Sequence, residues 1–273
     1  MKRVSFFILA IVMVAGCISS SSNNIGGIVI QEFRSDTDMI EAGDEFSMYA
    51  RIKNVGDVEA KDVDFVLNID DSLGCEKTCK MVSSMKGVDV ENNIDGEIAY
   101  CTWKCKAKEE HKGMVYNPRL RIYYKYLSIA SKKIMLMSRK ELLRMKQGKE
   151  TISLGEYKHT NSPLMIDIKS KSAVVRKSNM VEIPLTINVR NVGSGTVCKE
   201  NCKNKEEWYR VRIKVEGNGS ASGCNKDVYL WDGKEGSVSC TLKVKGSELA
   251  EKYINVVAKY GYFIEGETTF KII

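Results

Sequence analysis

The sequence lacks three features that would point to common classes of protein. Its longest apolar run, Phe6–Ala15, is far shorter than the ~18 to 20 residues of a bilayer-spanning helix, so we expect no transmembrane anchor. The formal net charge of +7 is spread along the chain, which argues against a nucleic-acid partner. Histidine occurs only as His111 and His159, without a nucleophile-elbow, zinc-protease or phosphate-loop motif. We therefore expect surface histidines and no catalysis.

The first 17 residues follow the pattern of an export signal. Lys2 and Arg3 precede the apolar run, which ends at Val14-Ala15-Gly16-Cys17. This segment resembles a lipoprotein signal. The resemblance implies that residues 1–16 are removed and that the Cys17 thiol carries a lipid anchor at the extracytoplasmic face of the cell membrane. Residues 17–27 would form a flexible tether, and an ordinary secreted protein is the alternative.

Three short landmarks occur twice in the rest of the chain, in the same order. Arg51-Ile-Lys-Asn-Val-Gly56 recurs as Asn188-Val-Arg-Asn-Val-Gly193, Cys101-Thr-Trp-Lys104 as Cys240-Thr-Leu-Lys243, and Tyr124-Lys-Tyr126 as Tyr260-Gly-Tyr262. The second members lie 137, 139 and 136 positions after the first. This spacing predicts a tandem duplication, with one domain at 28–137 and another at 161–273. We expect residues 161–273 to fold alone, because each copy would bury its own core.

Apolar and polar residues alternate in both copies, as in strands with one buried face. Short alternating segments between turns predict an all-β fold of two antiparallel sandwiches. Pro184 falls within one such segment and would suit an edge strand. The predicted inward positions include Phe46, Met48, Ala50 and Ile52 in the first copy, and Val181, Ile183, Leu185, Ile187 and Val189 in the second.

A linker separates the two copies. Ser138 and Glu141 have the spacing of a capping box, which predicts a short helix over 138–147 within a linker at 138–160. Because a helix of two turns is marginal alone, we expect Leu142, Leu143 and Met145 to pack onto the first domain.

The order of these features resembles a known family of surface domains. An Asn-x-Gly turn after a strand, then a second strand and a later Tyr-rich strand, is similar to Ig-like domains of the CARDB type, found on archaeal and bacterial cell surfaces. The resemblance covers both copies. It implies tandem Ig-like domains with an adhesive, binding or scaffolding role, and a cell-envelope protein or a glycan as partner. No cofactor is expected.

Eight cysteines follow Cys17, four in each copy, and outside the cytosol an even number favours disulfides. The repeat favours Cys75–Cys101 and Cys224–Cys240, which leaves Cys79–Cys105 and Cys198–Cys202. A nested pairing, Cys75–Cys105 with Cys79–Cys101, stays open because both sums equal 180, as in antiparallel strands. Thiolate metal ligands, or a redox role for Cys198–Cys202, are the alternatives to structural bridges.

The remaining candidates lie in predicted loops. Trp103 follows the inward pattern, whereas Trp208 and Trp231 border loops; Trp231, near Lys226 and Lys234, is the best candidate for contact with a sugar or a protein. Asn218 begins an Asn-Gly-Ser glycosylation sequon. A solute-binding lipoprotein of a transporter is an alternative function, but it would need alternating strands and helices. A thiol-redox or metal-handling surface protein is the other.

Overall fold

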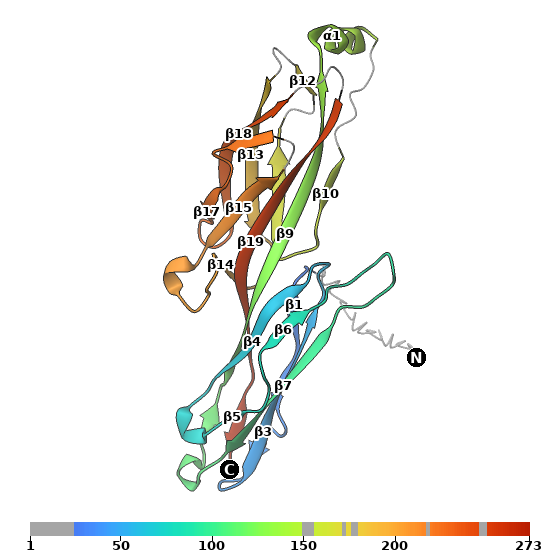
Figure 1. Ribbon diagram of the computed structural model, residues 1–273. Helices are drawn as coiled ribbons and strands as arrows, with labels where there is room; N and C mark the ends of the chain where they lie inside the picture. Colours follow the sequence, from blue (N-terminus) through green and yellow to red (C-terminus); the bar gives the residue numbers. More distant parts are fainter. Residues whose placement is uncertain (1–24, 149–155, 171–172, 176–179, 217–218, 246–249) are drawn as a thin grey trace, which may run out of the picture.

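The computed structural model describes residues 25–148, 156–170, 173–175, 180–216, 219–245 and 250–273. Its strands form four sheets, mostly antiparallel, so the predicted all-β class is confirmed. Figure 1 shows an elongated molecule of two lobes, with the C terminus at the free end of one of them. We name that lobe, which contains most of residues 28–137, lobe 1, and the other lobe 2.

One large sheet, here named the back sheet, runs through both lobes (Figure 1). Its main path contains β17 (Lys226–Tyr229), β15 (Arg210–Glu216), β19 (Ala250–Glu267), β9 (Arg119–Met137), β4 (Ala60–Asn68) and β6 (Val82–Met85). Three short strands add to it: β10 (Tyr157–His159) and β12 (Ala173–Val175) pair with β9, and β14 (Thr196–Cys198) pairs with β19.

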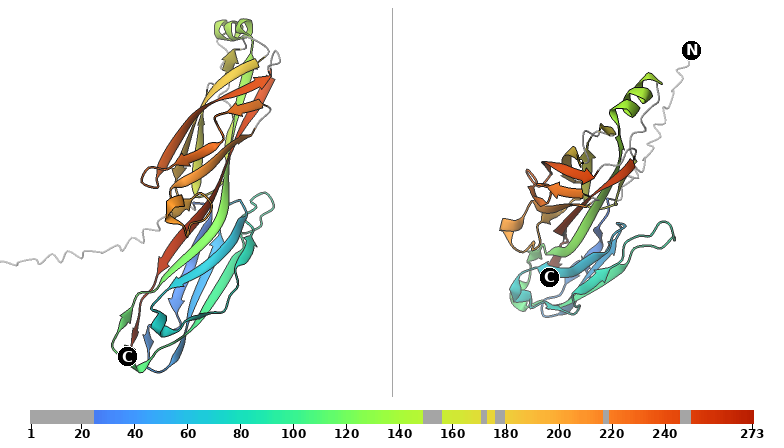
Figure 2. Two further views of the ribbon diagram at one scale, coloured as in Figure 1. Left: turned by 60° about the vertical axis from the view of Figure 1, so that its left-hand side comes forward. Right: turned by 45° about the horizontal axis from the view of Figure 1, so that its top comes forward.

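Two four-stranded front sheets cover the same face of the back sheet, one in each lobe (Figure 2). Even-numbered residues of β9, apart from the partly buried Lys132, are buried from Leu120 in lobe 1 to Leu136 in lobe 2, so both front sheets pack on that face. In lobe 1 the order is β1 (Ile28–Ser35), β3 (Glu45–Asn54), β7 (Ile98–Lys106) and β5 (Glu76–Lys77). In lobe 2 it is β11 (Leu164–Lys169), β13 (Met180–Asn191), β18 (Glu235–Lys245) and β16 (Gly219–Ser222).

The alternation in the sequence places the core as expected. Every second residue of β3, from Phe46 to Ile52, is buried, and the inward residues of β13 from Val181 to Val189 are buried too. Trp103 is 3% exposed and packs edge-on against Phe65, with ring centroids 6.5 Å apart, so its expected place in the core is confirmed. In a strand with one face on a core, buried residues recur at every second position, so the sequence alone could predict them.

The two lobes share their longest strands. β9 and β19 pair antiparallel along all 18 residues of β19, from lobe 1 into lobe 2. Lys125 lies opposite Gly261, and these two residues are equivalent in the sequence repeat, so a local two-fold axis passes through this pair. The second half of β19 therefore completes the back sheet of lobe 1, and the second half of β9 completes that of lobe 2.

The last strand of the second copy also belongs to lobe 1. β20 (Phe270–Ile272) pairs with β2 (Met39–Ile40) and β8 (Val115–Tyr116) of the first copy. Strand pairing thus crosses the predicted domain bounds, 28–137 and 161–273. It removes the basis for expecting residues 161–273 to fold alone, because β20 pairs only with strands of the first copy and β19 pairs with β9 along its whole length.

Two local expectations need correction. Helix α1 (Arg139–Gln147) follows Ser138, as the capping box predicted, but it lies at the far tip of lobe 2 (Figure 1). Leu143 is 51% exposed, so its expected packing on the first domain is wrong; Leu142 lies outside the described side chains. Pro184 lies in β13, an inner strand that pairs with β18 opposite Thr241, so its expected position on an edge strand is wrong. Short 3-10 helices occur at η1 (Asp71–Leu73), η2 (Glu109–His111) and η3 (Lys205–Glu207).

Candidate functional site

Two of the predicted modification sites fall outside the described residues. Cys17 lies within residues 1–24, and Asn218 lies within 217–218. Lipidation of Cys17 and glycosylation of Asn218 therefore stay predictions. No helix in the described part of the chain is long and apolar enough to cross a membrane.

The eight cysteines after Cys17 form four pairs within the copies. The expected pairs Cys198–Cys202 and Cys224–Cys240 are present. In the first copy the nested pairs Cys75–Cys105 and Cys79–Cys101 occur, in place of Cys75–Cys101 with Cys79–Cys105. The register of β5 on β7 explains this: Lys77 lies opposite Trp103, and antiparallel pairing keeps the sum of residue numbers at 180.

The sequence repeat predicted the wrong pairing in the first copy because Cys101 and Cys240, which it aligns, do not occupy equivalent positions in the two lobes. Trp103 lies opposite Met48 in lobe 1, and Cys240 lies opposite Leu185 in lobe 2. Met48 and Leu185 are 137 positions apart, as are Asn54 and Asn191, so Cys240 takes the place of Trp103. An alignment error of two residues along a strand leaves each side chain on the same face of the sheet. The alternation of apolar and polar residues therefore could not reveal the error.

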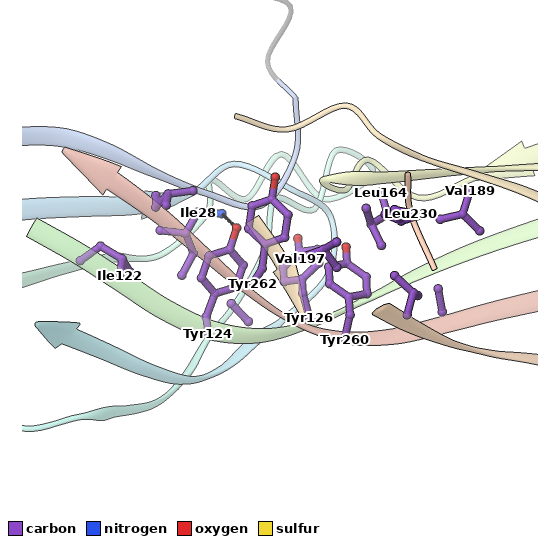
Figure 3. Close-up of a cluster of buried hydrophobic side chains, with 14 of the residues drawn as sticks. Ile28, Ile122, Tyr124, Tyr126, Leu164, Val189, Val197, Leu230, Tyr260 and Tyr262 are labelled. Carbon is purple, nitrogen blue, oxygen red and sulfur yellow. Dashed lines mark hydrogen bonds between the residues drawn. The ribbon is translucent and has the colours of Figure 1, made fainter. Parts of the chain in front are cut away.

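Four buried tyrosines from the shared strands lie where the lobes meet (Figure 3). The Tyr126 hydroxyl donates to Asn54 Oδ1 at 3.3 Å, and the Tyr262 hydroxyl donates to Asn191 Oδ1 at 2.8 Å. Burial raises the pKa of all four phenols, and that of Tyr262 reaches about 12. The others are Tyr124, whose hydroxyl accepts from Ile28 N, and Tyr260, whose hydroxyl bonds Ser128 Oγ.

The repeated Asn-Val-Gly landmark serves this junction. Asn54 Nδ2 donates to Val58 O at 2.8 Å and Asn191 Nδ2 to Gly195 O at 2.9 Å, so each side chain closes its own turn. A Cβ on the glycine of either motif would collide with the phenol oxygen of Tyr126 or Tyr262. The landmarks are therefore structural: they join the turns of the front sheets to the tyrosines of the shared strands.

The two histidines lie in different surroundings. His111 is 4% exposed and its ring lies 5.8 Å from that of Tyr116, so its expected surface position is wrong. It is the last residue of η2, whereas His159 is exposed, as expected. Among the described residues, no group of three or more His, Cys, Asp or Glu side chains could hold a metal ion.

Trp208 and Trp231, both expected near loops, differ in exposure. Trp208 is half-buried: its Nε1 donates to Cys202 O at 2.7 Å, and its ring lies 5.4 Å from that of Phe263. Trp231 is 74% exposed and lies edge-on to Tyr229, which is 47% exposed, with centroids 5.5 Å apart. Trp231 is thus the most open aromatic side chain that the described chain presents to a partner.

A tight turn fixes Trp231 in place. Trp231 N donates to Glu235 O at 2.7 Å, and Asp232 and Gly233 between them have φ of 52° and 68°. Leu230, just before, is fully buried, and Lys234 O accepts from Asn191 N of the junction at 2.7 Å. The backbone around Trp231 is therefore constrained by the buried Leu230 on one side and by the hydrogen bond from Asn191 N on the other.

A shallow cleft of about 540 Å³ lies beside Trp231, on the outer face of the front sheet of lobe 2. Asp167, Asn188 and Ser237 face each other in one row across β11, β13 and β18. Arg190 and Glu235 form the next row, which ends at Trp231. The cleft thus combines an aromatic wall with a floor of hydrogen-bonding side chains.

The charged groups of this floor have no ionic partner in the part of the chain that the structure describes. No ion pair there involves Asp167, Arg190 or Glu235, and the contact between Asn188 Nδ2 and Asp167 Oδ2 is long, at 3.5 Å. Lys234, which sequence reasoning placed near Trp231, pairs instead with Asp232 at 3.4 Å. Asp167 and Asn188 were missed, because only the pairing of β11 with β13 and of β13 with β18 brings them beside Trp231.

Comparisons with known proteins do not assign this chain to a family. No protein-family model matches it, and no curated protein does. Among solved structures, the secreted serine protease VesC from Vibrio cholerae is similar at 8% identity with a TM-score of 0.25. The match covers 89% of this chain but 51% of the protease, so the chain spans about half of that structure's length. A TM-score this low establishes neither a shared fold nor a shared activity.

Proposed function

We propose that the protein is a lipid-anchored surface protein at the extracytoplasmic face of the cell membrane, whose two Ig-like lobes bind or scaffold and do not catalyse. The cysteines carry this proposal. Eight of the nine are bonded in pairs, and the ninth, Cys17, ends the lipobox pattern. Four bridges fit an oxidising compartment, and a single remaining thiol in a lipobox fits lipid attachment.

The path of the chain defines how an anchored molecule would stand. Gly26 N donates to Asn161 Oδ1 at 2.9 Å, and Val55 N donates to Gly27 O at 2.8 Å, so the chain enters the fold at the junction of the lobes. Cys17 lies only eight residues before Ile25, a reach of at most about 29 Å. A tether attached at the middle would hold the long body side-on to the membrane, with both lobes available to a partner.

Two other functions make different demands on the protein. A solute-binding lipoprotein would need lobes of mixed strands and helices around a deep cleft, whereas the described chain is all-β with one helix of nine residues. A thiol-redox or metal-handling protein would show reducible bridges or bound metal. An absorbance spectrum and metal analysis of the purified protein distinguish that function from a binding role.

The proposed anchor is tested by Cys17→Ser, with Ser19→Ala as the matched control. Only a thiol can form the lipid thioether, so Cys17→Ser is expected to leave the membrane fraction or to remain uncleaved, and to lose incorporation of labelled fatty or isoprenoid lipid. The control should behave as the unaltered protein. Membrane fractionation of Cys17→Ser identical to that of the control would reject the lipoprotein assignment.

A further inference from the structure

We propose that the cleft beside Trp231 binds a neutral glycan, with one sugar ring stacked on the indole and its hydroxyls bonded to the floor of the cleft. The proposal rests on the proposed extracytoplasmic location, where such chains occur, and adds the class of ligand. It follows from the shape of the aromatic wall, the chemistry of the floor and the balance of charge.

The aromatic wall presents a large, pre-positioned face. Trp231 is 74% exposed on a turn held by backbone hydrogen bonds, so binding would order little of the backbone. Tyr229 meets it edge-on, with 88° between the ring planes, which supports the indole from one side. A flat apolar face beside polar groups suits a sugar, whose ring has an apolar face and a rim of hydroxyls.

The floor supplies both acceptors and donors for hydroxyl groups. Carboxylates of Asp167 and Glu235 accept, the guanidinium of Arg190 donates, and the Asn188 amide does both. Residues opposite each other on antiparallel strands lie about 4.5 to 5.5 Å apart, so the row across β11, β13 and β18 offers several groups to one or two sugar rings. Because no ion pair among the described residues involves Asp167, Arg190 or Glu235, a ligand would break no ion pair. It would compete only with the hydrogen bond from Arg190 Nη2 to Met165 Sδ, at 3.3 Å, and the long one from Asn188 Nδ2 to Asp167 Oδ2, at 3.5 Å.

The charge of the cleft favours a neutral ligand. Asp167 and Glu235 are balanced by Lys169 and Arg190, so an anionic polymer gains no net attraction. A protein partner fits less well, because the centre of a protein interface is depleted in charged side chains. Here charged and amide groups occupy the floor itself, directly beside the aromatic pair.

Glycan binding is measured on the full-length protein in mild detergent. The probes are immobilised neutral oligosaccharides of glucose, mannose, galactose and N-acetylglucosamine, with sulfated and sialylated chains as the anionic arm. Trp231→Ala is expected to weaken binding about tenfold or more, as loss of a central aromatic anchor does. The matched control is Tyr100→Ala, which removes a 63% exposed aromatic from the corresponding outer face of lobe 1 and should bind as the unaltered protein does.

Fluorescence gives an independent readout at the same residue. Trp103 is 3% exposed and Trp208 is half-buried, so quenching by acrylamide reports mainly on Trp231. A bound neutral oligosaccharide should protect this fluorescence, and Trp231→Phe should remove the protected component while keeping measurable affinity. Asn188→Ala, which leaves the indole intact, should weaken binding by a smaller factor.

Three results would overturn the proposal. These are an absence of binding to every neutral oligosaccharide, binding that Trp231→Ala leaves unchanged, or binding confined to the anionic arm. Binding of a purified envelope protein that depends on Trp231, with no glycan bound, would assign the cleft to a protein partner instead. None of these results bears on the anchor, since fractionation of Cys17→Ser tests the lipid independently of any ligand.

Discussion

The two lobes are built alike where they meet and differ where they face solvent. At the junction each contributes an Asn-Val-Gly turn and a pair of tyrosines, joined by a hydrogen bond from tyrosine to asparagine. On the outer faces, lobe 1 has Arg34 over Tyr49 and Arg51 over Tyr100, at 5.6 and 5.8 Å. Lobe 2 has Trp231, which no described Lys or Arg covers. The shared features thus hold the lobes together, and the differing features are free to recognise partners.

Lobe 2 also carries a segment that lobe 1 lacks. Between Gly195 and β15 the chain forms β14, the Cys198–Cys202 loop and η3. In this segment β14 joins the back sheet beside β19, and Cys198 and Cys202 contact Phe263 of β19. Lys203 Nζ reaches Asp64 of the first copy at 3.1 Å. The Cys198–Cys202 disulfide, which has no counterpart in lobe 1, therefore lies in a segment that also contacts the first copy across the junction.

The largest effect is expected from separating the copies. A fragment of residues 161–273 lacks β9, β2 and β8. One edge of β19 would therefore be unpaired along its whole length and β20 would have no partner, so we expect the fragment to aggregate or remain unfolded. Circular dichroism during heating should show no cooperative transition, whereas the full chain should melt cooperatively.

Complementation sharpens this comparison. Residues 25–148 and 156–273, produced together, should associate through the ladder of β9 and β19 and regain the melting transition, because the cut falls between paired strands. Autonomous cooperative folding of 161–273 would show that lobe 2 does not depend on the shared strands.

Disulfides should stabilise the lobes by smaller and unequal amounts. Cys224–Cys240 spans 16 residues, so replacing both with Ala should lower the free energy of unfolding by about 3 kcal/mol. Cys75–Cys105 spans 30 residues, but Cys79–Cys101 lies inside it and leaves only about eight residues of loop to close. Its removal should therefore cost about 2.5 kcal/mol, less than its span alone predicts. Denaturant titration measures both.

Peptide mapping checks the pairing on which that difference depends. Trypsin cleaves after Lys77, between Cys75 and Cys79, and after Lys104, between Cys101 and Cys105. Non-reducing digestion should therefore give two separate linked species, one joining the peptides of Cys75 and Cys105 and the other those of Cys79 and Cys101. A species that joins Cys75 to Cys101 would contradict the nested pairing.

The sequence predicted what depends on local patterns and missed what depends on register across distant strands. Alternation located the inward residues of β3 and β13, and the capping box located α1. The landmarks were found, but they were interpreted as marks of two separate domains. Nothing local distinguishes a strand that ends in its own lobe from one that continues into the next, so the shared ladder of β9 and β19 was missed. Asp167 was missed beside Trp231 for the same reason, since β11 and the turn before β18 are far apart in the chain.

The smallest expected effects compare the two tyrosine hydrogen bonds at the junction. Tyr262→Phe would leave both Asn191 Oδ1 and Gly195 N without this partner, whereas Tyr126→Phe would leave Asn54 Oδ1 still accepting from Gly56 N at 3.2 Å. We expect losses in the free energy of unfolding of about 2 and about 1 kcal/mol, respectively. The half-exposed Tyr253→Phe is the control on the same strand and should change it little. Equal losses in the free energy of unfolding for Tyr262→Phe and Tyr126→Phe would show that the two hydrogen bonds stabilise the junction equally.

Alkaline pH tests the same phenols in another way. Burial raises the pKa of Tyr262 to about 12 from the ordinary value of 10.0, so near neutral pH the phenol is protonated whether the chain is folded or unfolded. Above pH 10 the unfolded chain loses this proton while the folded chain keeps it, so the stability that the buried phenol contributes falls between pH 10 and pH 12. The slope attributable to Tyr262 should approach about 1.4 kcal/mol per pH unit. Denaturant titrations at pH 9, 10.5 and 11.5 should show a correspondingly shallower decline for Tyr262→Phe; an unchanged slope would mean that the phenol ionises without unfolding the junction.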